Sequence, residues 1–434
     1  MSSLLLWMTI GLLPLLVPHG PGNTAPVDVF AGGFIVLTLL ALVQRGRRLA
    51  VPAGPALALI VAGSLVALAF SRDSRTALLT LLVDVYLLLL LVAIANHLDG
   101  DPRALRAVLA VWTASAAVWA AVLIGVHWQL LPRVFAQLLN IPEGAKRAAG
   151  STGNNPNLAA SYLMTSFFIL LASPWPRRRP VRWVLAAWLL LGLFATGSLG
   201  GLLGLVAGMA LLTVGLYLRG GRTARQVQAL AGAALLAGAL AVAALLAVAG
   251  LPRFSLAEVT TVSAQAKQGV LADSVGRASR SLAGRLGLWS AAVAKAGPQA
   301  LVGIGPGTAK TELQISNGRV DPDGVVRVHS LHNDYLAFLV ERGLLGLAGL
   351  LALYAALLRR SLRVAVTARG VGVMALAAGV LANAADSAFH ETFHFRHAIV
   401  LFALVWVAAS VGREREAVAH HASPRPLEDH HAVG

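Results

Sequence analysis

The sequence predicts an all-α polytopic membrane protein, and three observations support that fold class. Hydrophobic residues make up 57% of the 434 positions and charged residues only 12%, which is about half the charged fraction of a soluble domain. The apolar residues are gathered into long runs of the length that crosses a bilayer as a helix. The short alternating segments of a transmembrane barrel are absent from the pattern.

We count about twelve apolar runs and predict a span at each. Residues 1–18 lack the basic start and small-residue cleavage site of a secretory signal, so we interpret them as the first span. The predicted spans lie near 3–18, 28–43, 52–70, 77–96, 104–126, 156–173, 182–197, 199–218, 227–250, 333–358, 366–385 and 395–411.

The arginines predict the orientation of these spans. With the N-terminus in the cytoplasm and the spans alternating, clusters of arginine fall in the short inner loops, as the positive-inside rule requires. The net charge of +16 is therefore a topology signal rather than a sign of nucleic-acid binding. The arginines in the inner loops are Arg45, Arg47, Arg48, Arg103, Arg106, Arg177, Arg178, Arg179, Arg182, Arg219, Arg222, Arg225, Arg359, Arg360 and Arg363.

This orientation places one large segment, 251–331, on the outer face and divides the chain into four parts. Residues 1–250 carry nine spans, 251–331 form the outer loop, 332–411 carry three spans, and 412–434 form a cytoplasmic tail that we expect to be disordered. The outer loop has nine Lys/Arg against five Asp/Glu. Either an anionic ligand such as a pyrophosphate or contact with anionic lipid headgroups would explain this bias.

Two shorter segments also fall on the outer face. In segment 127–155, Asn155 is placed to cap the helix that follows it. Segment 386–397 carries His390, His394 and His397 at helical spacings. These three histidines predict either a second polar patch or part of an aromatic belt.

The pair His329 and His332 is the first candidate for chemistry. If the next helix begins early, the spacing i, i+3 puts both rings on one helix face. A general base, or a group that positions an acceptor hydroxyl, fits imidazole best, with Asn333 and Asp334 orienting the ring. A zinc site is disfavoured because no H-E-x-x-H pattern or acidic ligand is suitably spaced, and the absence of cysteine excludes thiolate chemistry. The alternative is a plain polar helix start.

Three arginines upstream are the second candidate. Arg277, Arg280 and Arg285 are spaced to follow a helix, and guanidinium groups bind phosphate oxygens in a bidentate fork. The alternative is a solvated basic face, with Trp289 as an interfacial anchor.

Two further features lie near the predicted site. Residues 303–308 (Gly-Ile-Gly-Pro-Gly-Thr) predict a tight turn that can bring backbone N–H groups to an anion. Asp84 is an acid in mid-span, where a carboxylate marks either function or a buried ion pair. The other ionisable residues concentrate at the outer surface, which favours surface chemistry over a permease or channel.

The order of these motifs resembles the O-antigen ligase/polymerase superfamily of bacterial membrane glycan transferases. The matching residues are Arg285 and Trp289, the 303–307 run, 329–336 (His-Ser-Leu-His-Asn-Asp-Tyr-Leu), 341–346 (Glu-Arg-Gly-Leu-Leu-Gly) and 155–159. The resemblance implies about twelve transmembrane helices with one large periplasmic loop domain, a GT-C-like arrangement, in the bacterial inner membrane. It also implies metal-independent transfer, without a cofactor, from an undecaprenyl-pyrophosphate-linked glycan donor.

The resemblance further implies an acceptor and a set of site residues. A ligase would use the lipid A–core oligosaccharide, whereas a polymerase would use another carrier-linked repeat. His332 would act on the acceptor hydroxyl and Arg285 on the pyrophosphate. The substrate-binding residues would be His329, Arg277, Arg280, Asn333, Tyr335, Arg147 and Arg396. The chain departs from the family at Leu199, where an arginine is expected after a serine, so one pyrophosphate ligand would come from elsewhere, such as Arg133, Arg147 or Arg396.

Overall fold

The computed structural model is predominantly helical. The predicted span 227–250, most of the large outer segment and the end of the C-terminal tail lie outside the described residues. The structure describes residues 1–16, 24–139, 148–149, 152, 155–219, 285–320, 326–328, 330–367 and 371–422.

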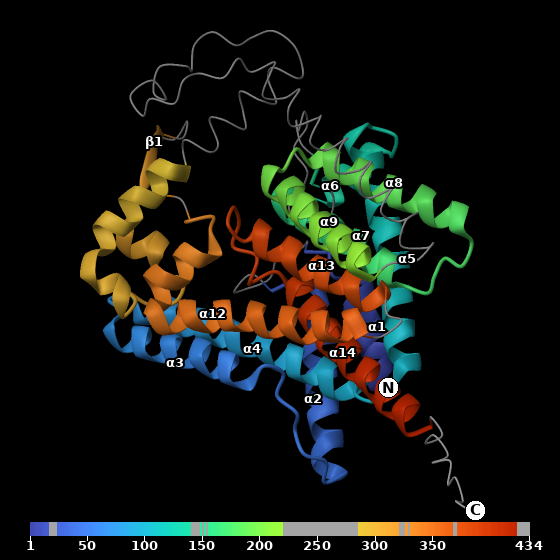
Figure 1. The fold of residues 1–434 in the computed structure, drawn as a ribbon. Helices are drawn as coiled ribbons and strands as arrows, with labels where there is room; N and C mark the ends of the chain where they lie inside the picture. Colours follow the sequence, from blue (N-terminus) through green and yellow to red (C-terminus); the bar gives the residue numbers. More distant parts are fainter. Residues whose placement is uncertain are drawn as a thin grey trace, which may run out of the picture.

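The elements follow one another from blue to red in Figure 1. Residues 285–296 are also helical, and β1 and β2 pair antiparallel. The printed elements are α1 (Ser2–Gly11), α2 (Pro26–Gln44), α3 (Gly54–Phe70), α4 (Ser74–Leu98), α5 (Pro102–His127), α6 (Arg133–Leu138), α7 (Pro156–Ala172), α8 (Arg179–Thr196), α9 (Leu199–Arg219), η4 (Gly297–Leu301), η5 (Ala309–Leu313), β1 (Ser316–Val320), β2 (Val326–Val328), α12 (Asp334–Thr367), α13 (Val371–Asp386) and α14 (Arg396–Ala422).

Six of the described helices are long and apolar enough to cross a membrane, and five shorter ones are also apolar. Every predicted span except 227–250 overlaps one of them, although α1 ends at Gly11, earlier than expected. The prediction of a helical membrane protein is confirmed at this level, while the count of twelve stays a prediction. The tail prediction is wrong for residues 412–422, because α14 continues to Ala422.

Side-chain caps explain where several helices begin. Oδ1 of Asn155 accepts hydrogen bonds from the N–H groups of Asn157 and Leu158, both at 3.1 Å, which satisfies two donors that a helix start leaves open. The predicted cap is therefore confirmed. Asp73 and Asp101 cap α4 and α5 in the same way.

Helix α12 is broken at Gly343, whose φ of 69° and ψ of −170° are not helical. The predicted continuous span 333–358 is therefore wrong at this point. The break leaves two carbonyl groups of the first part without helical partners, and the 303–308 turn takes them. The N–H of Ile304 donates to the carbonyl of Val340, and that of Gly305 to the carbonyl of Glu341, both at 3.0 Å.

Beyond the break, α12 lies directly along α3 (Figure 1). A Cβ at Gly63 of α3 would lie 2.5 Å from the backbone nitrogen of Gly346, and one at Gly349 would lie 2.7 Å from that of Ile60. Small residues let membrane helices approach this closely and gain dispersion contacts. α12 is thereby fixed against α3.

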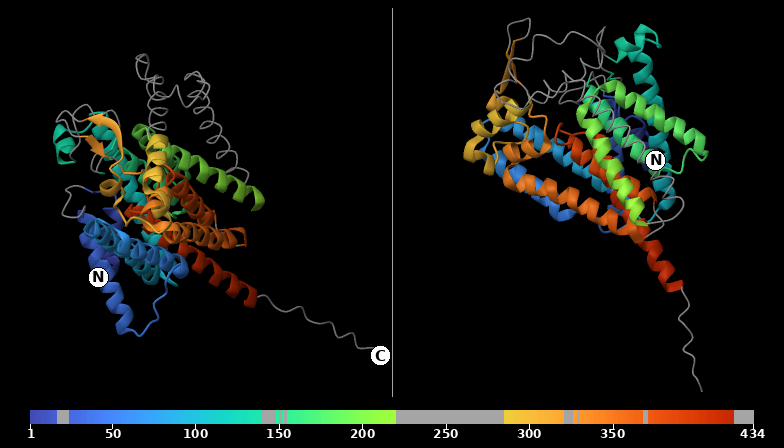
Figure 2. Two further views of the ribbon diagram at one scale, coloured as in Figure 1. Left: turned by 90° about the vertical axis from the view of Figure 1, so that its left-hand side faces the viewer. Right: turned by 45° about the horizontal axis from the view of Figure 1, so that its top comes forward.

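A second, smaller apolar cluster joins residues 285–315 to the start of α12. The right-hand view of Figure 2 shows these residues, in yellow, at one end of the α3–α4–α12 layer. This small core positions the candidate site. Its buried members are Leu288, Ala292, Ala296, Ala300, Ile304, Ala309, Leu313, Ile315, Leu331, Ala337 and Val340.

Candidate functional site

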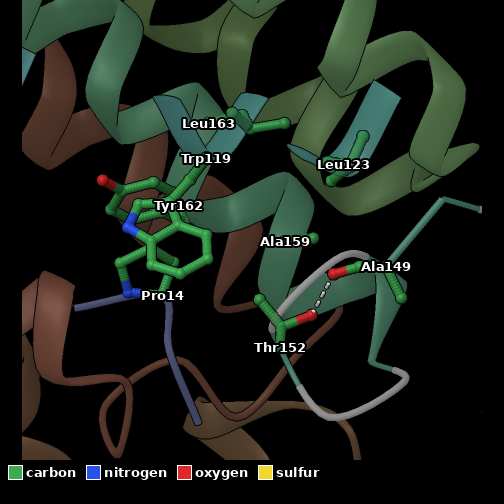
Figure 3. A pocket seen from close by; sticks show the side chains of 8 residues that line it. All are labelled: Pro14, Trp119, Leu123, Ala149, Thr152, Ala159, Tyr162 and Leu163. Carbon is green, nitrogen blue, oxygen red and sulfur yellow. Dashed lines mark hydrogen bonds between the residues drawn. The ribbon is translucent and has the colours of Figure 1, made fainter. Parts of the chain in front are cut away.

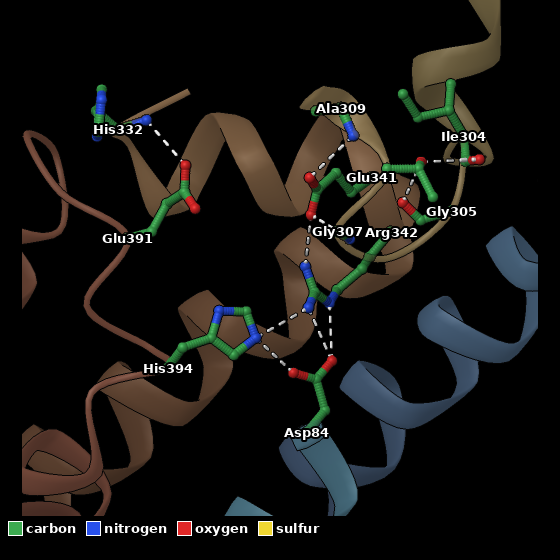
Figure 4. Close-up of polar contacts among 11 residues, drawn as sticks. Asp84, Ile304, Gly305, Gly307, Ala309, His332, Glu341, Arg342, Glu391 and His394 are labelled. Atoms are coloured by element: carbon green, nitrogen blue, oxygen red, sulfur yellow. Dashed lines mark hydrogen bonds and ion pairs between the residues drawn. The ribbon is translucent and has the colours of Figure 1, made fainter. Parts of the chain in front are cut away.

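Several ionisable side chains of the described residues converge where four pieces of the chain meet, and we call this place the junction. The pieces are the middle of α4, the break in α12, the 301–309 loop, and residues 387–395 between α13 and α14. Figure 4 shows the side chains of Asp84, Arg342 and His394 meeting, with the loop's backbone beside Glu341.

Asp84 finds two cationic partners at the junction. Nη2 of Arg342 lies 2.8 Å from Oδ2 of Asp84, and Nε2 of His394 lies 2.7 Å from Oδ1. The side chains of Asp84 and Arg342 are 1% exposed, whereas that of His394 is 30% exposed. The buried-pair interpretation of Asp84 is confirmed.

The backbone of the 303–308 turn binds a carboxylate of the protein itself, that of Glu341. The N–H of Gly307 donates to Oε2 of Glu341 at 2.9 Å, and the N–H of Ala309 donates to Oε1 at 3.3 Å. Nη1 of Arg342 lies 3.2 Å from the same carboxylate. The turn, Glu341 and Arg342 thus form one unit that closes over the break in α12.

His332 lies before α12, not on it. Its φ of +50° is left-handed, so the helical face predicted for His329 and His332 does not form, and His329 lies outside the described residues. The backbone N–H of His332 donates to Oε1 of Glu391 at 2.9 Å. Nδ1 of its ring lies 3.3 Å from the hydroxyl of Ser330.

The neighbours expected to orient the ring of His332 have other partners. Oδ1 of Asn333 accepts from the N–H of Leu336 at 3.0 Å, so Asn333 caps α12. Asp334 is buried and accepts from the N–H and hydroxyl of Thr392 at 2.8 and 3.0 Å. The hydroxyl of Tyr335 donates to the carbonyl of Ala384 at 2.7 Å. Asn333 thus caps the helix at its start, while Asp334 and Tyr335 fix that start against the 387–395 segment and α13.

Two groups of the 387–395 segment have altered acidity. Burial raises the pKa of Glu391, and the Asp334 carboxylate raises it further, although the N–H of His332 opposes both. Burial works against protonation of His394, but its hydrogen bond to Asp84 and the charge of that carboxylate outweigh it, so the pKa of His394 is raised. The junction therefore favours protons on these two side chains.

Arg285 and His332 come from segments that are tied together. Nε1 of Trp289, one turn after Arg285, donates to the carbonyl of Leu331 at 2.8 Å. The guanidinium carbon of Arg285 lies 6.0 Å from the ring centroid of Phe389. Burial lowers the pKa of Arg285, and the charge of Asp386 opposes that shift. The arginine thus faces the segment between α13 and α14.

Of the remaining arginines predicted to bind substrate, the structure describes the side chain of Arg396. Arg277, Arg280 and Arg147 lie outside the described residues, as does the side chain of Arg133. Arg396 forms a bidentate pair with Asp28, a carboxylate that also accepts from the hydroxyl of Tyr86 at 2.7 Å.

The three histidines of the last outer segment do not form one helical patch, because α14 begins only at Arg396. Each contacts a different helix. Nδ1 of His390 lies 2.6 Å from Asp386, Nε2 of His394 contacts Asp84 of α4, and Nε2 of buried His397 lies 3.1 Å from the hydroxyl of Ser161 in α7.

A small hollow lies elsewhere, among the segment after α1, α5, α7 and the segment before α7 (Figure 3). It is mostly apolar, and the hydroxyl of Thr152 turns to the carbonyl of Ala149. Because it lacks charged lining residues, we do not assign the chemistry to it. The lining residues are Pro14, Trp119, Leu123, Ala149, Thr152, Ala159, Tyr162 and Leu163.

Sequence reasoning did not assign roles to Arg342, Glu391 or Thr392. A signal existed for Arg342, because an arginine inside an apolar run needs a carboxylate partner and Asp84 is the acid in mid-span. No comparable signal marked Glu391 or Thr392, whose contacts depend on how the 387–395 segment folds back onto α12.

The fold and the junction define a helical membrane protein with an ionisable site built where a long helix is broken. Residues 184–351 match the family model described as O-antigen ligase. This stretch contains Arg285, His332 and Arg342, and the match supports a relationship to the O-antigen ligase-like superfamily. The match supports a glycosyltransferase-type enzyme of the membrane. No curated protein matches the chain.

Proposed function

We propose that the protein is an O-antigen ligase. It transfers a glycan from undecaprenyl pyrophosphate to lipid A–core oligosaccharide on the periplasmic face of the inner membrane, with both termini in the cytoplasm. The family match supports the class of reaction. The observation that carries the proposal is the Trp289–Leu331 hydrogen bond of 2.8 Å, because it ties the Arg285 segment to the His332 segment.

In this reaction His332 takes the proton of the acceptor hydroxyl as its oxygen attacks the anomeric carbon. The bond from that carbon to the pyrophosphate oxygen breaks, and its electron pair leaves with the pyrophosphate. Displacement in one step inverts the anomeric centre. Arg285 stabilises the charge that develops on the leaving group, since fixed cations aimed at such charge lower the barrier.

The other predicted substrate-binding residues have two kinds of role in this proposal: some contact the substrates, and others hold the site in place. His329, Arg277, Arg280 and Arg147 would meet the carrier or the acceptor sugar. Asn333, Tyr335 and Arg396 are engaged by neighbouring groups, and we assign the first two to holding the His332 segment in place.

A first test uses the variants His332→Ala and Arg285→Ala. Both should abolish glycan transfer in cells that lack the native gene, while the protein still inserts into the membrane at normal levels. The control is Arg103→Ala, which changes an exposed side chain beside the cap of α5. Normal product from either of the first two variants would remove that residue from the mechanism.

A polymerase that joins carrier-linked repeat units is the second candidate, because the same base and phosphate ligand would serve it. The glycans of a deletion strain separate the two. Loss of core-attached polymer while carrier-linked polymer accumulates identifies a ligase. Products limited to one repeat identify a polymerase and would overturn the proposal.

A further inference from the structure

A second carboxylate–imidazole pair lies at the end of α13, apart from the junction's Asp84–His394 pair. Nδ1 of His390 lies 2.6 Å from Oδ1 of Asp386, four residues earlier. Asp386 is 0% exposed and His390 is 3% exposed. A carboxylate accepts only, so the hydrogen of this bond sits on Nδ1 of the ring.

The pair buries two polar atoms that no described residue satisfies. They are Nε2 of His390 and Oδ2 of Asp386. Burying a polar atom without a partner costs free energy, and buried groups of this kind in folded proteins almost always have one. With Nδ1 bound to the carboxylate, Nε2 is the atom of the ring that remains to meet a ligand.

The first turn of α9 lies against this pair. A Cβ at Gly200 would lie 2.5 Å from Oδ1 of Asp386 and 2.5 Å from Cε1 of His390. Only a residue without a side chain allows that approach. The N–H groups of a first helical turn have no partners within the helix, and they favour negative charge nearby.

Arg285 adds a guanidinium on the same side. It lies near Phe389, which immediately precedes His390, and the charge of Asp386 acts on it. A His390 ring with a hydrogen on both nitrogens carries one positive charge, as Arg285 does. These two positive charges exceed the single negative charge of Asp386. The surroundings then fit a ligand that is an anion and accepts hydrogen bonds.

We propose that His390, held by Asp386, donates its Nε2–H to a phosphate oxygen of the polyprenyl pyrophosphate, beside Arg285 and the start of α9. This inference deepens the proposed function, since it names a further ligand for the donor of that reaction. The histidine would take the place of the arginine that the resemblance implies at Leu199, the residue next to Gly200, whereas Arg396 is engaged by Asp28.

Binding to the full-length protein purified in detergent tests this role. The probes are undecaprenyl pyrophosphate and inorganic pyrophosphate, with phosphatidylglycerol as a phosphodiester headgroup for comparison. His390→Asn keeps an amide donor near the position of Nδ1 and loses Nε2. His390→Gln instead places an amide nitrogen near the position of Nε2. His97→Asn is the matched control, because His97 contacts Ser3 at the far end of α4.

We expect His390→Asn to bind both pyrophosphate probes at least tenfold more weakly than the wild type, and His390→Gln to recover much of the affinity. His97→Asn should bind as the wild type does. Size-exclusion and thermal unfolding profiles confirm that each variant is folded. Wild-type affinity in folded His390→Asn would overturn the inference, as would phosphatidylglycerol binding as tightly as the carrier.

The two proposals fail in different ways. If the wild type transfers no glycan but His390→Asn still loses pyrophosphate binding, the proposed function is wrong and the phosphate contact is supported. If the wild type transfers glycan and folded His390→Asn binds pyrophosphate and transfers glycan normally, the phosphate contact is wrong and the proposed function is supported.

Discussion

Arg342 is a charged residue buried in an apolar helix, and its surroundings explain why it is tolerated. Its guanidinium bridges Asp84 at 2.8 Å and Glu341 at 3.2 Å and stacks over the ring of Phe338 at 4.4 Å. A buried charge is costly unless opposite charges and hydrogen bonds compensate it. Two carboxylates share one guanidinium here, and the proton on His394 completes the balance.

Removal of this guanidinium should destabilise the protein strongly. We expect Arg342→Ala to lower the free energy of unfolding by about 3–5 kcal/mol, because it leaves two buried carboxylates without their partner. Denaturant or thermal unfolding in detergent measures the change. Arg359→Ala, at an exposed position of the same helix, should change stability by less than about 0.5 kcal/mol. Equal effects for the two variants would mean that the buried network contributes little.

His394 should make stability depend on pH. Its pKa is raised above the ordinary value of 6.5 by Asp84, so the folded state binds the proton more tightly than the unfolded state. The stabilisation is fully present below about pH 6.5 and is lost as the pH rises through the folded value. We expect the unfolding temperature of the wild type to exceed that of His394→Gln most at about pH 6, with the difference shrinking toward pH 9. Parallel curves would contradict this expectation.

At the same scale, the sequence predicted the local contacts of the site better than the contacts between residues far apart in the chain. It indicated that Asp84 needs a partner, but Arg342 lies 258 positions away and only the packing of α12 near α4 brings the two together. The Asn155 cap was predictable because a cap depends on the next three residues. The ring of His332 was assigned to a helix face that does not exist, because His332 has a left-handed φ and lies two positions before Asp334, the first residue of α12.

At the scale of elements, the break in α12 organises the site. The sequence suggested a tight turn at 303–308 and a continuous helix after 333, and only the first was right. Gly343 is inconspicuous in sequence, because glycine is common in membrane helices. Its role becomes visible in the structure, where a Cβ would lie 2.5 Å from the carbonyl oxygen of Val302.

Substitution of this glycine should disturb the turn and the activity together. Gly343→Ala combines a left-handed φ with a clash against backbone, and we expect a loss of stability of about 2 kcal/mol or more. Thermal unfolding and glycan transfer by the same preparation measure both effects. Gly287→Ala is the matched control, because nothing lies within 4 Å of the added methyl, and a helical alanine is neutral or stabilising. A fully active, stable Gly343→Ala protein would show that the turn does not depend on the break.

At the scale of the whole molecule, the apolar runs predicted the helices well, since a membrane span depends mainly on the composition of its own segment. They predicted less about how helices distant in sequence pack, because the close contacts of Gly63 with Gly346 depend on residues nearly three hundred positions apart. The proposed reaction further requires that the junction and Arg285 face the periplasm, which the arginine distribution predicts.

The orientation can be tested cleanly, because the chain has no cysteine and each introduced thiol is the sole target of a maleimide. Ser290→Cys lies at an exposed position in the Arg285 segment, and Ala50→Cys at an exposed position between α2 and α3. In spheroplasts, a membrane-impermeant maleimide should label Ser290→Cys at once and Ala50→Cys only after the membrane is opened. The positive-inside rule predicts this order, because it assigns the α2–α3 loop with Arg45, Arg47 and Arg48 to the cytoplasm. The reverse order would put Arg285 on the cytosolic side, where the proposed lipid A–core acceptor chemistry on the periplasmic face could not occur.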